Sequence, residues 1–423
     1  MKIRYICCIA VFFLTFCSVS MEARAENITV VIDPGHGGEN LGGQYDAYTE
    51  KDMTIITAAA MKEELEKYEG ITVYMTREGD KELSLEERVE YAKSVHADFL
   101  FCLHYNMSVK HNLFGAEVWV SAFGEQYQKG YTFANVEMEM LTDFGLYSRG
   151  IKTKFNDRGV DYYGIIRRAT QIQMPAVIIE HCHLDQDNDT EFYNSDEKMK
   201  QMGILDATAV AKYYGLKSDI LGVDYGSYQN IEIPVPSSPV KPDKTPPDVC
   251  SIEVNGVDET TGMVDVTLYA QDYDNHMLYY SYSYNGGLTF SALQKWEPTD
   301  TDTIQFQMNV PSGFVPEIVV NAYNAFDGFT ESNHIPLASM SYGEDMKEDA
   351  SQAEAKPEQS YKDISFDNEQ KNSDKGKEDK QDSVWYFIQV CFVCIAILIV
   401  LFLLAYIILS SVRGSKKKRR RRK

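Results

Sequence analysis

The feature that most restricts the fold of this chain is an uncharged apolar run from Val384 to Leu409. A helix of this length, rising ~1.5 Å per residue, crosses the ~30 Å hydrocarbon layer of a membrane. Trp385 and Tyr386 stand where an interfacial aromatic belt is expected. We therefore predict a transmembrane helix over residues 384–410.

A strongly basic tail follows this run. Residues 411–423 contain nine Lys and Arg and no acidic residue, so the positive-inside rule places the C-terminus in the cytoplasm. A stop-transfer signal is the simplest interpretation, a partner-binding tail is the alternative, and both allow contact with anionic membrane lipid. The whole chain is acidic, with 63 Asp and Glu against 41 Lys and Arg. This balance argues against a nucleic-acid partner.

The N-terminus is typical of a secretory signal peptide, predicted over residues 1–25. A basic start, an apolar stretch from Tyr5 to Ser20 and the sequence Ala-Arg-Ala ending at Ala25 support cleavage there. An uncleaved anchor is the alternative. The chain is then expected to sit in the cell membrane, extracellular up to about Ser383 and spanning the bilayer once.

Cysteine usage excludes a disulfide-stapled secreted domain. Five of the eight cysteines lie in the predicted signal peptide and span, which leaves Cys102, Cys182 and Cys250. Three cysteines are too few for a disulfide framework. Cys102 and Cys182 would pair only if two strand ends were adjacent. With 44% apolar residues, the chain can instead build an ordinary hydrophobic core.

Residues 27–217 alternate strand-like and helix-like segments. Strands are expected at 28–33, 71–77, 98–104 and 176–180, and helices at 49–68, after the capping-box sequence Ser84-Leu-Glu-Glu87, and within 189–214. This alternation predicts an α/β domain with a mostly parallel sheet flanked by helices.

Three further segments precede the predicted span. Residues 231–247 hold six of the 13 prolines and are expected to form a stiff, extended linker. Short alternating strands over residues 248–338 predict an immunoglobulin-like or fibronectin-like β-sandwich, acting as a spacer or as a ligand-binding module. Residues 341–383 are polar and charged with almost no aliphatic residues, which predicts a disordered acidic stalk.

Four polar side chains of the first domain lie at the ends of predicted strands or at the start of a predicted helix. His36 lies in a glycine-rich turn after the first strand, Glu50 lies in the first turn of the next helix, and His104 and Glu180 lie at the ends of two apolar strands. Sites in open α/β sheets form at the carboxyl ends of strands. The four residues are therefore expected to converge at one edge.

This set has the composition of a catalytic zinc site. Two imidazoles and one carboxylate, from His36, His104 and Glu50, leave a fourth position for water. Hydrolysis then needs one more carboxylate to move a proton from water to the leaving amine, and Glu180 is the candidate. Each residue alone has an ordinary structural explanation, such as a helix-dipole role for Glu50.

Seven motifs, in a fixed order along the chain, indicate how this set of four residues should be interpreted. They are VVIDPGHGG, TEK at 49–51, MTREGD at 75–80, SLEERVEYA at 84–92, LHYN at 103–106, GLYSRGIK at 145–152 and MPAVIIE at 174–180. Together they closely resemble the zinc-dependent N-acetylmuramoyl-L-alanine amidases of the amidase-3 type. The resemblance covers essentially all of residues 27–217.

The resemblance implies a specific enzyme acting on peptidoglycan. His36, Glu50 and His104 match the family's Zn²⁺ ligands, and Glu180 matches its catalytic glutamate. Asp33, beside the first ligand, is expected to orient an imidazole through its N–H. The reaction implied is hydrolysis of the amide that joins the lactyl group of N-acetylmuramic acid to L-alanine.

Two departures from the family pattern lie beside the site. His181-Cys182-His183 follows Glu180, where the family has a small residue, Gly and Phe, and Tyr105 replaces a small residue after His104. Strand alternation predicts that His181 and His183 face away from Glu180, which leaves a second metal site as an open alternative. Both departures are expected to affect the substrate groove.

Two other functions fit the same sequence. A non-catalytic wall-binding or scaffolding protein could use the amidase fold and the sandwich as adhesive modules, although the complete His36, Glu50, His104 and Glu180 set argues against it. A zinc peptidase that cuts bonds within the stem peptide would use the same site chemistry, and only its products would distinguish it.

Overall fold

The computed structural model describes residues 27–311, 313 and 315–337. The predicted signal peptide (1–25), stalk (341–383), transmembrane helix (384–410) and tail (411–423) lie outside the described residues. Among the residues that are described, no helix is long and apolar enough to cross a membrane.

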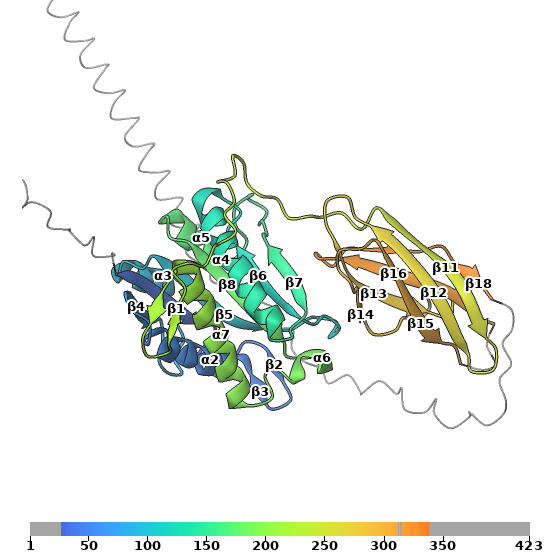
Figure 1. Cartoon of the computed structure of the whole chain (residues 1–423), viewed down its shortest axis with the longest axis horizontal. Coiled ribbons are helices and arrows are strands. Elements are labelled where there is room, and N and C mark those ends of the chain that lie inside the picture. The colour runs from blue at the N-terminus through green and yellow to red at the C-terminus, as the bar shows by residue number, and fades with distance from the viewer. Residues whose placement is uncertain (1–26, 312, 314, 338–423) are drawn as a thin grey trace, which may run out of the picture. The chain divides into compact units, whose positions relative to one another are not determined.

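The first domain is built on one six-stranded sheet in the order β4-β1-β5-β8-β6-β7 (Figure 1). All neighbouring pairs are parallel except β6 with β8, so the predicted mostly parallel sheet is confirmed. The strands are β1 (Ile28–Pro34), β4 (Ile71–Met75), β5 (Phe99–Asn106), β6 (Ala116–Val120), β7 (Ser148–Lys152) and β8 (Ala176–His183).

Helices flank this sheet, and their ends follow local sequence signals. They are α2 (Glu50–Leu65), α3 (Leu85–Ser94), α4 (Gly124–Asp143), α5 (Gly164–Gln171), α6 (Asp187–Thr190) and α7 (Asp196–Tyr214). The capping box predicted at Ser84 and Glu87 is confirmed, because each side chain accepts from the other residue's backbone N–H. Thr49 is the N-cap of α2 but makes no side-chain capping bond. Two short ladders, β2 (Gln44–Tyr45) with β3 (Tyr48–Thr49) and β9 (Lys217–Ser218) with β10 (Val223–Asp224), complete the domain.

One apolar core lies between the sheet and helices α2, α4 and α7. Alternate residues of the central strands, such as Leu103 on β5 and Ile179 on β8, pack against apolar residues of these helices, such as Met61 and Phe133. The central strands are apolar on both faces because helices cover both faces of a parallel sheet. Their carboxyl ends therefore supply a rigid edge on which polar side chains can be held.

Residues 249–336 form a β-rich region of two antiparallel sheets. One is β11-β12-β15 and the other is β14-β13-β16-β17, with β18 also paired to β16. The strands are β11 (Val249–Asp258), β12 (Met263–Gln271), β13 (Met277–Ser283), β14 (Gln294–Lys295), β15 (Thr303–Asn309), β16 (Glu317–Asn324), β17 (Phe329–Glu331) and β18 (Ile335–Pro336). Both sheets contribute to one apolar core, including Val266 and Val320. The immunoglobulin-like or fibronectin-like class stays a prediction.

Residues 231–247 contain no helix or strand. Their backbone bonds to the α/β domain at Val240 and at Ile233. The Val240 N–H donates to the Ala122 carbonyl and the Thr153 hydroxyl donates to the Val240 carbonyl, both at 2.9 Å, and the Gln128 side-chain amide donates to the Ile233 carbonyl at 2.6 Å. This part of the proline-rich segment therefore lies along the α/β domain.

Candidate metal centre and active site

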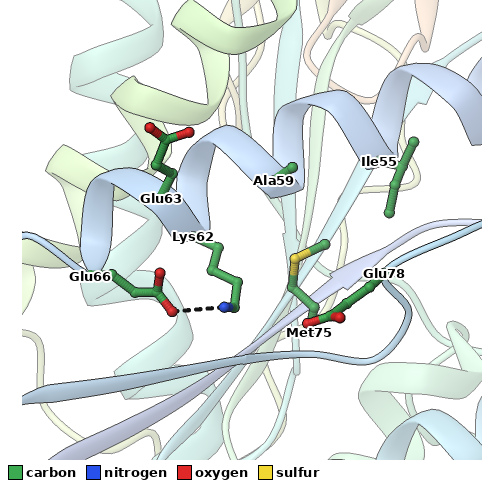
Figure 2. A pocket seen from close by; sticks show the side chains of 7 residues that line it. All are labelled: Ile55, Ala59, Lys62, Glu63, Glu66, Met75 and Glu78. Atoms are coloured by element: carbon green, nitrogen blue, oxygen red, sulfur yellow. Dashed lines mark hydrogen bonds and ion pairs between the residues drawn. The ribbon is translucent and has the colours of Figure 1, made fainter.

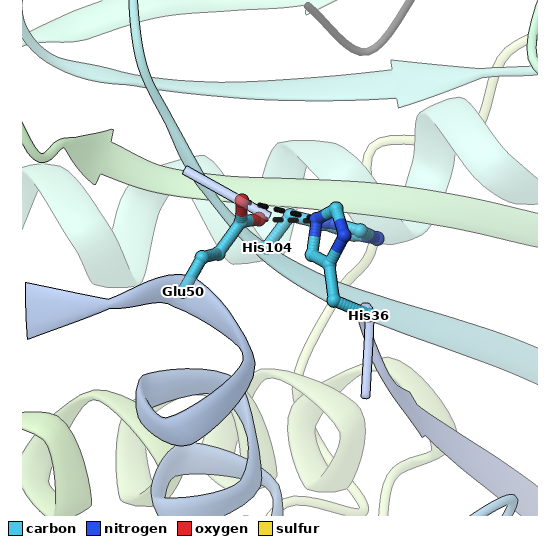
Figure 3. A group of neighbouring side chains, drawn as sticks. All are labelled: His36, Glu50 and His104. Atoms are coloured by element: carbon cyan, nitrogen blue, oxygen red, sulfur yellow. Dashed lines mark hydrogen bonds and ion pairs between the residues drawn. The ribbon is translucent and has the colours of Figure 1, made fainter. Parts of the chain in front are cut away.

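Three of the four predicted residues meet in one buried group (Figure 3). Glu50 lies between the two imidazoles: its Oε2 is 3.0 Å from His36 Nε2, and its Oε1 is 2.9 Å from His104 Nδ1. The three potential ligand atoms lie within 4.8 Å of one another. All three residues are buried.

The turn after β1 places His36. This residue has φ 60°, a left-handed conformation that is uncommon outside glycine and often found at functional sites. Asn40 fixes the ring, because its Oδ1 is 2.9 Å from His36 Nδ1. That contact leaves Nε2 directed at Glu50.

Gly42 closes the same turn against the site. It has φ +69°, and a Cβ there would lie 2.5 Å from Glu50 Oε2 and 2.6 Å from the His36 ring. Only glycine allows both this conformation and this approach. The glycine-rich turn therefore packs directly against the candidate ligands His36 and Glu50.

The Glu50 carboxylate is oriented by backbone donors as well as by imidazoles. The Gly43 N–H donates to Oε2 at 2.7 Å, and the Tyr105 N–H donates to Oε1 at 3.1 Å. Although burial opposes it, the imidazoles of His36 and His104 hold the pKa of Glu50 well below its usual range. The carboxyl is therefore ionised across the physiological pH range.

These residues fit a zinc ion. Burial lowers the pKa of His104, which favours the neutral imidazole that a metal requires. Two imidazole nitrogens and one carboxylate oxygen converge on one buried point, and this donor set is the His₂Glu set of catalytic zinc sites. His36, Glu50 and His104 would hold the ion.

Glu180 lies directly beside this group. It pairs with His104 in the parallel ladder of β5 and β8, and it is 2% exposed. Its Oε2 is buried and has no hydrogen-bond partner among the described residues. Burial first, and then the charges of Glu50 and Glu117, raise the pKa of Glu180 well above its usual value. A carboxyl in this environment can hold a proton near neutral pH, as a general acid–base group must.

Asp33 has a different position from the one expected. Its Oδ1 accepts from Arg88 Nη1 at 2.8 Å and also from the Thr76 hydroxyl, whereas Asn40 orients the His36 ring. Arg88 also donates to the His36 carbonyl at 2.7 Å. Asp33 is therefore linked to His36 through Arg88, which fixes the backbone of the turn.

Glu117 on β6 is a site neighbour that our sequence analysis missed. It pairs with Glu180 across the β6–β8 ladder and is 3% exposed. Its carboxylate accepts from Asn106, Trp119, Arg149 and Lys152 at 2.7–3.0 Å. Although burial opposes it, Lys152 and Arg149 hold its pKa well below the usual range. A single acidic residue inside the apolar run 116–120 was the signal that could have indicated it.

The histidines after Glu180 face opposite sides, which corrects our prediction. The ladder shifts register between His104–Glu180 and Asn106–His183, so one residue of β5 faces two of β8. This β-bulge returns His183 to the face of Glu117. Its Nδ1 is 3.1 Å from the Gly115 carbonyl, and burial followed by nearby Arg149 lowers its pKa to about 3. His181 faces away from Glu180, as predicted, and its Nε2 is 3.0 Å from Asp206 on α7.

The side chain of Tyr105 does not line the site, although its backbone N–H does. Its ring is fully buried in the core, and its hydroxyl is 2.6 Å from the Thr57 hydroxyl on α2. Neither His181 nor His183 belongs to a group of three potential metal ligands among the described residues. The side chains at both departures from the family pattern are therefore buried inside the fold.

Three other features do not belong to this group. Cys102, Cys182 and Cys250 are free thiols. A groove beside α2 and β4, lined by residues such as Ile55 and Met75 and by the ion pair of Lys62 with Glu66, contains none of the candidate ligands (Figure 2). A cluster of three aspartates, Asp243, Asp272 and Asp274, is the second group of potential ligands in the described part of the chain.

Comparisons with known proteins match the α/β domain. Residues 30–212 match the profile of the Amidase_3 family, described as N-acetylmuramoyl-L-alanine amidase. The uncharacterized protein YqiI of Bacillus subtilis (strain 168) is 28% identical over 189 residues, which are 45% of this chain and 86% of that protein. The N-acetylmuramoyl-L-alanine amidase CwlM of Bacillus licheniformis is 26% identical over 197 residues, covering 45% and 71%.

Solved structures are also similar. The catalytic domain of CwlV, an N-acetylmuramoyl-L-alanine amidase from Bacillus (Paenibacillus) polymyxa var. colistinus, is 26% identical with a TM-score of 0.39. The match covers 45% of this chain and 99% of that one.

Proposed function

Because the α/β domain of this chain belongs to the amidase-3 family of N-acetylmuramoyl-L-alanine amidases, we propose that the chain is a zinc-dependent enzyme that removes stem peptides from peptidoglycan. The bond cut would be the amide between the lactyl group of N-acetylmuramic acid and L-alanine. One observation carries the proposal: Glu180 lies beside a buried group of His36, Glu50 and His104.

His36 Nε2, His104 Nδ1 and a Glu50 oxygen are the atoms that would hold zinc. When bound, zinc polarises a scissile carbonyl and makes water a stronger acid. The chain itself holds the three side chains in fixed, buried positions, because Asn40 and backbone N–H groups orient them.

Glu180 is proposed to move the proton. Its carboxylate would accept a proton from the attacking water and deliver it to the nitrogen of the leaving L-alanine, so that the amine departs uncharged. Two features support this role. Its Oε2 has no partner in the described residues, and burial together with two neighbouring carboxylates raises its affinity for a proton.

Metal analysis of the purified full chain tests this proposal against a non-catalytic wall-binding role. We expect about one zinc per chain and release of stem peptides from purified peptidoglycan. A chain that binds peptidoglycan but contains no zinc, and releases no peptide when zinc is added, would support the binding role instead.

The proposed substrate lies outside the cell membrane, and we propose that the enzyme is anchored there. The predicted signal peptide, the predicted span over residues 384–410 and its basic tail support this location and contact with membrane lipid. Expression of the chain ending at residue 383 tests the anchor. We expect the shortened protein in the culture medium and the full chain in the membrane fraction, and equal distribution of the two would contradict it.

A further inference from the structure

His181 lies fully buried behind the candidate metal centre and bonds in two directions. Its Nδ1 is 2.9 Å from the backbone carbonyl oxygen of His104, and its Nε2 is 3.0 Å from both carboxylate oxygens of Asp206. A carbonyl oxygen and a carboxylate can only accept, so His181 donates from both nitrogens. The ring therefore links the backbone of a candidate zinc ligand to helix α7.

This link sits at the bulge between β5 and β8. His104 and Glu180 form the last regular pair before the register shifts, and a bulge disrupts the regular hydrogen bonds of a ladder. Here a side chain, His181, fixes the carbonyl of His104. The orientation of that peptide sets the direction of the His104 side chain, and binding sites require their groups to be held within about 0.5 Å.

Stability alone gives no reason for this arrangement. Asp206 and Glu137 are also fully buried, and burial followed by the charge of Asp206 raises the pKa of Glu137 well above its usual value. Removing charged groups from water is costly, and apolar side chains of similar size usually serve a core as well or better. The surrounding core is apolar, with Ile179 and Cys182 as neighbours in β8.

We propose that His181 is a positioning residue for the candidate zinc site. It touches neither substrate nor metal. It donates to the carbonyl of His104, and Asp206 holds its ring in place, so that His104 Nδ1 stays directed at the site it shares with Glu50 and His36. This inference rests on the proposed zinc site and adds a residue that acts on it from the core.

Two polar substitutions separate the two bonds of His181. In His181→Asn the amide nitrogen falls near the position of Nδ1 and can still donate to the His104 carbonyl. In His181→Gln it falls near Nε2 and reaches Asp206 only. We expect the zinc dissociation constant of the full chain, measured by chelator competition, to stay within about threefold of wild type for His181→Asn and to rise about tenfold or more for His181→Gln.

Glu137→Gln is the matched control, because a glutamine keeps an uncharged donor beside Asp206 and leaves both bonds of His181 in place. It should leave zinc affinity unchanged. The absorption spectrum of the Co²⁺-loaded protein gives a second measurement, and only His181→Gln is expected to change it. Equal affinity of His181→Gln and wild type would overturn the inference, as would equal losses in all three variants, which would indicate general core damage.

The double variant His181→Leu/Asp206→Leu keeps the test decisive if His181→Gln does not fold. It replaces the buried pair by apolar groups, so we expect a metal-free protein at least as stable as wild type with the same loss of zinc affinity. Unchanged zinc affinity in this folded variant would also overturn the inference. A wild-type chain that binds no zinc would instead contradict the proposed function.

Discussion

Glu180 lies directly opposite His104 in the parallel pairing of β8 with β5. One strand thus presents a buried carboxyl, with one oxygen lacking a hydrogen-bond partner in the described residues, beside a candidate metal ligand on the next strand. Neighbouring parallel strands are rigid at this point because helices cover both of their faces. The pairing therefore places a candidate proton-transfer group and a candidate metal ligand side by side at one edge of the sheet.

Glu180→Gln should separate metal binding from catalysis. We expect the rate of stem-peptide release to fall about 10²- to 10⁴-fold, the usual contribution of a general acid–base group. Zinc content should remain that of wild type, because Glu180 is outside the group formed by His36, Glu50 and His104. A variant that releases peptides at the wild-type rate would show that another group moves the proton.

Zinc removal should cost both activity and stability. The free energy of unfolding gains about 4 kcal/mol when free zinc is a thousandfold above its dissociation constant. We therefore expect a chelator to abolish activity and lower the thermal midpoint, and added zinc to restore both. Glu50→Gln should show little response to zinc, since it removes the carboxylate between the imidazoles. A chelator-treated enzyme with full activity would contradict the proposed site.

Gly42→Ala should damage the site more than its backbone conformation explains. A Cβ at Gly42 would lie 2.5 Å from Glu50 Oε2, whereas a Cβ at Gly159 would meet nothing within 4 Å, and both residues have positive φ, +69° and +74°. The two alanine variants therefore carry similar backbone strain. We expect Gly42→Ala to lose zinc affinity and activity and Gly159→Ala to lose only some stability, as measured by zinc titration and thermal unfolding. Equal zinc affinity in both would contradict the close packing of this turn.

Asp189→Asn should change how stability depends on pH. Burial raises the pKa of Asp189 from 3.8 to about 6, although the Gly115 and His183 N–H groups oppose this rise. The folded state therefore favours the neutral acid, and the stability this provides is complete below about pH 4 and lost as the pH rises through about 6. At about 1.4 kcal/mol per pKa unit, the loss is up to about 3 kcal/mol.

An asparagine does not ionise, so Asp189→Asn should be spared this loss and still accept both N–H bonds. We expect the difference in unfolding free energy between the variant and wild type to grow in favour of the variant from pH 4 to pH 7. Denaturant unfolding of the full chain at several pH values measures it. Parallel curves would mean that Asp189 keeps an ordinary pKa in the folded protein.

The central strands were predictable because their sequences are simple. Strands β1, β5 and β8 are apolar runs that end in polar residues, which is the pattern of a parallel strand covered on both faces. Strands β6 and β7 are short and carry Glu117, Arg149 and Lys152, which form ion pairs only after folding. No periodicity within either strand indicates such a pairing.

The candidate ligands were predictable for a related reason. The residues that orient them were not. His36, Glu50 and His104 follow recognisable elements, whereas Asn40 holds the His36 ring through a turn whose shape depends on left-handed residues. Strict alternation placed His183 on the wrong face because a bulge between strands distant in sequence shifts the register. Its position depends on pairing that a single strand does not reveal.

Mass spectrometry of the products from purified peptidoglycan tests the central claim most directly, because it names the bond that is cut. We predict free stem peptides with an unblocked L-alanine N-terminus, together with glycan strands whose N-acetylmuramic acid residues keep a free lactyl carboxylate. Glu180→Gln, run in parallel, should give neither product above background. Products cut between amino acids of the stem peptide, with L-alanine still attached to the glycan, would contradict the claim and identify a peptidase.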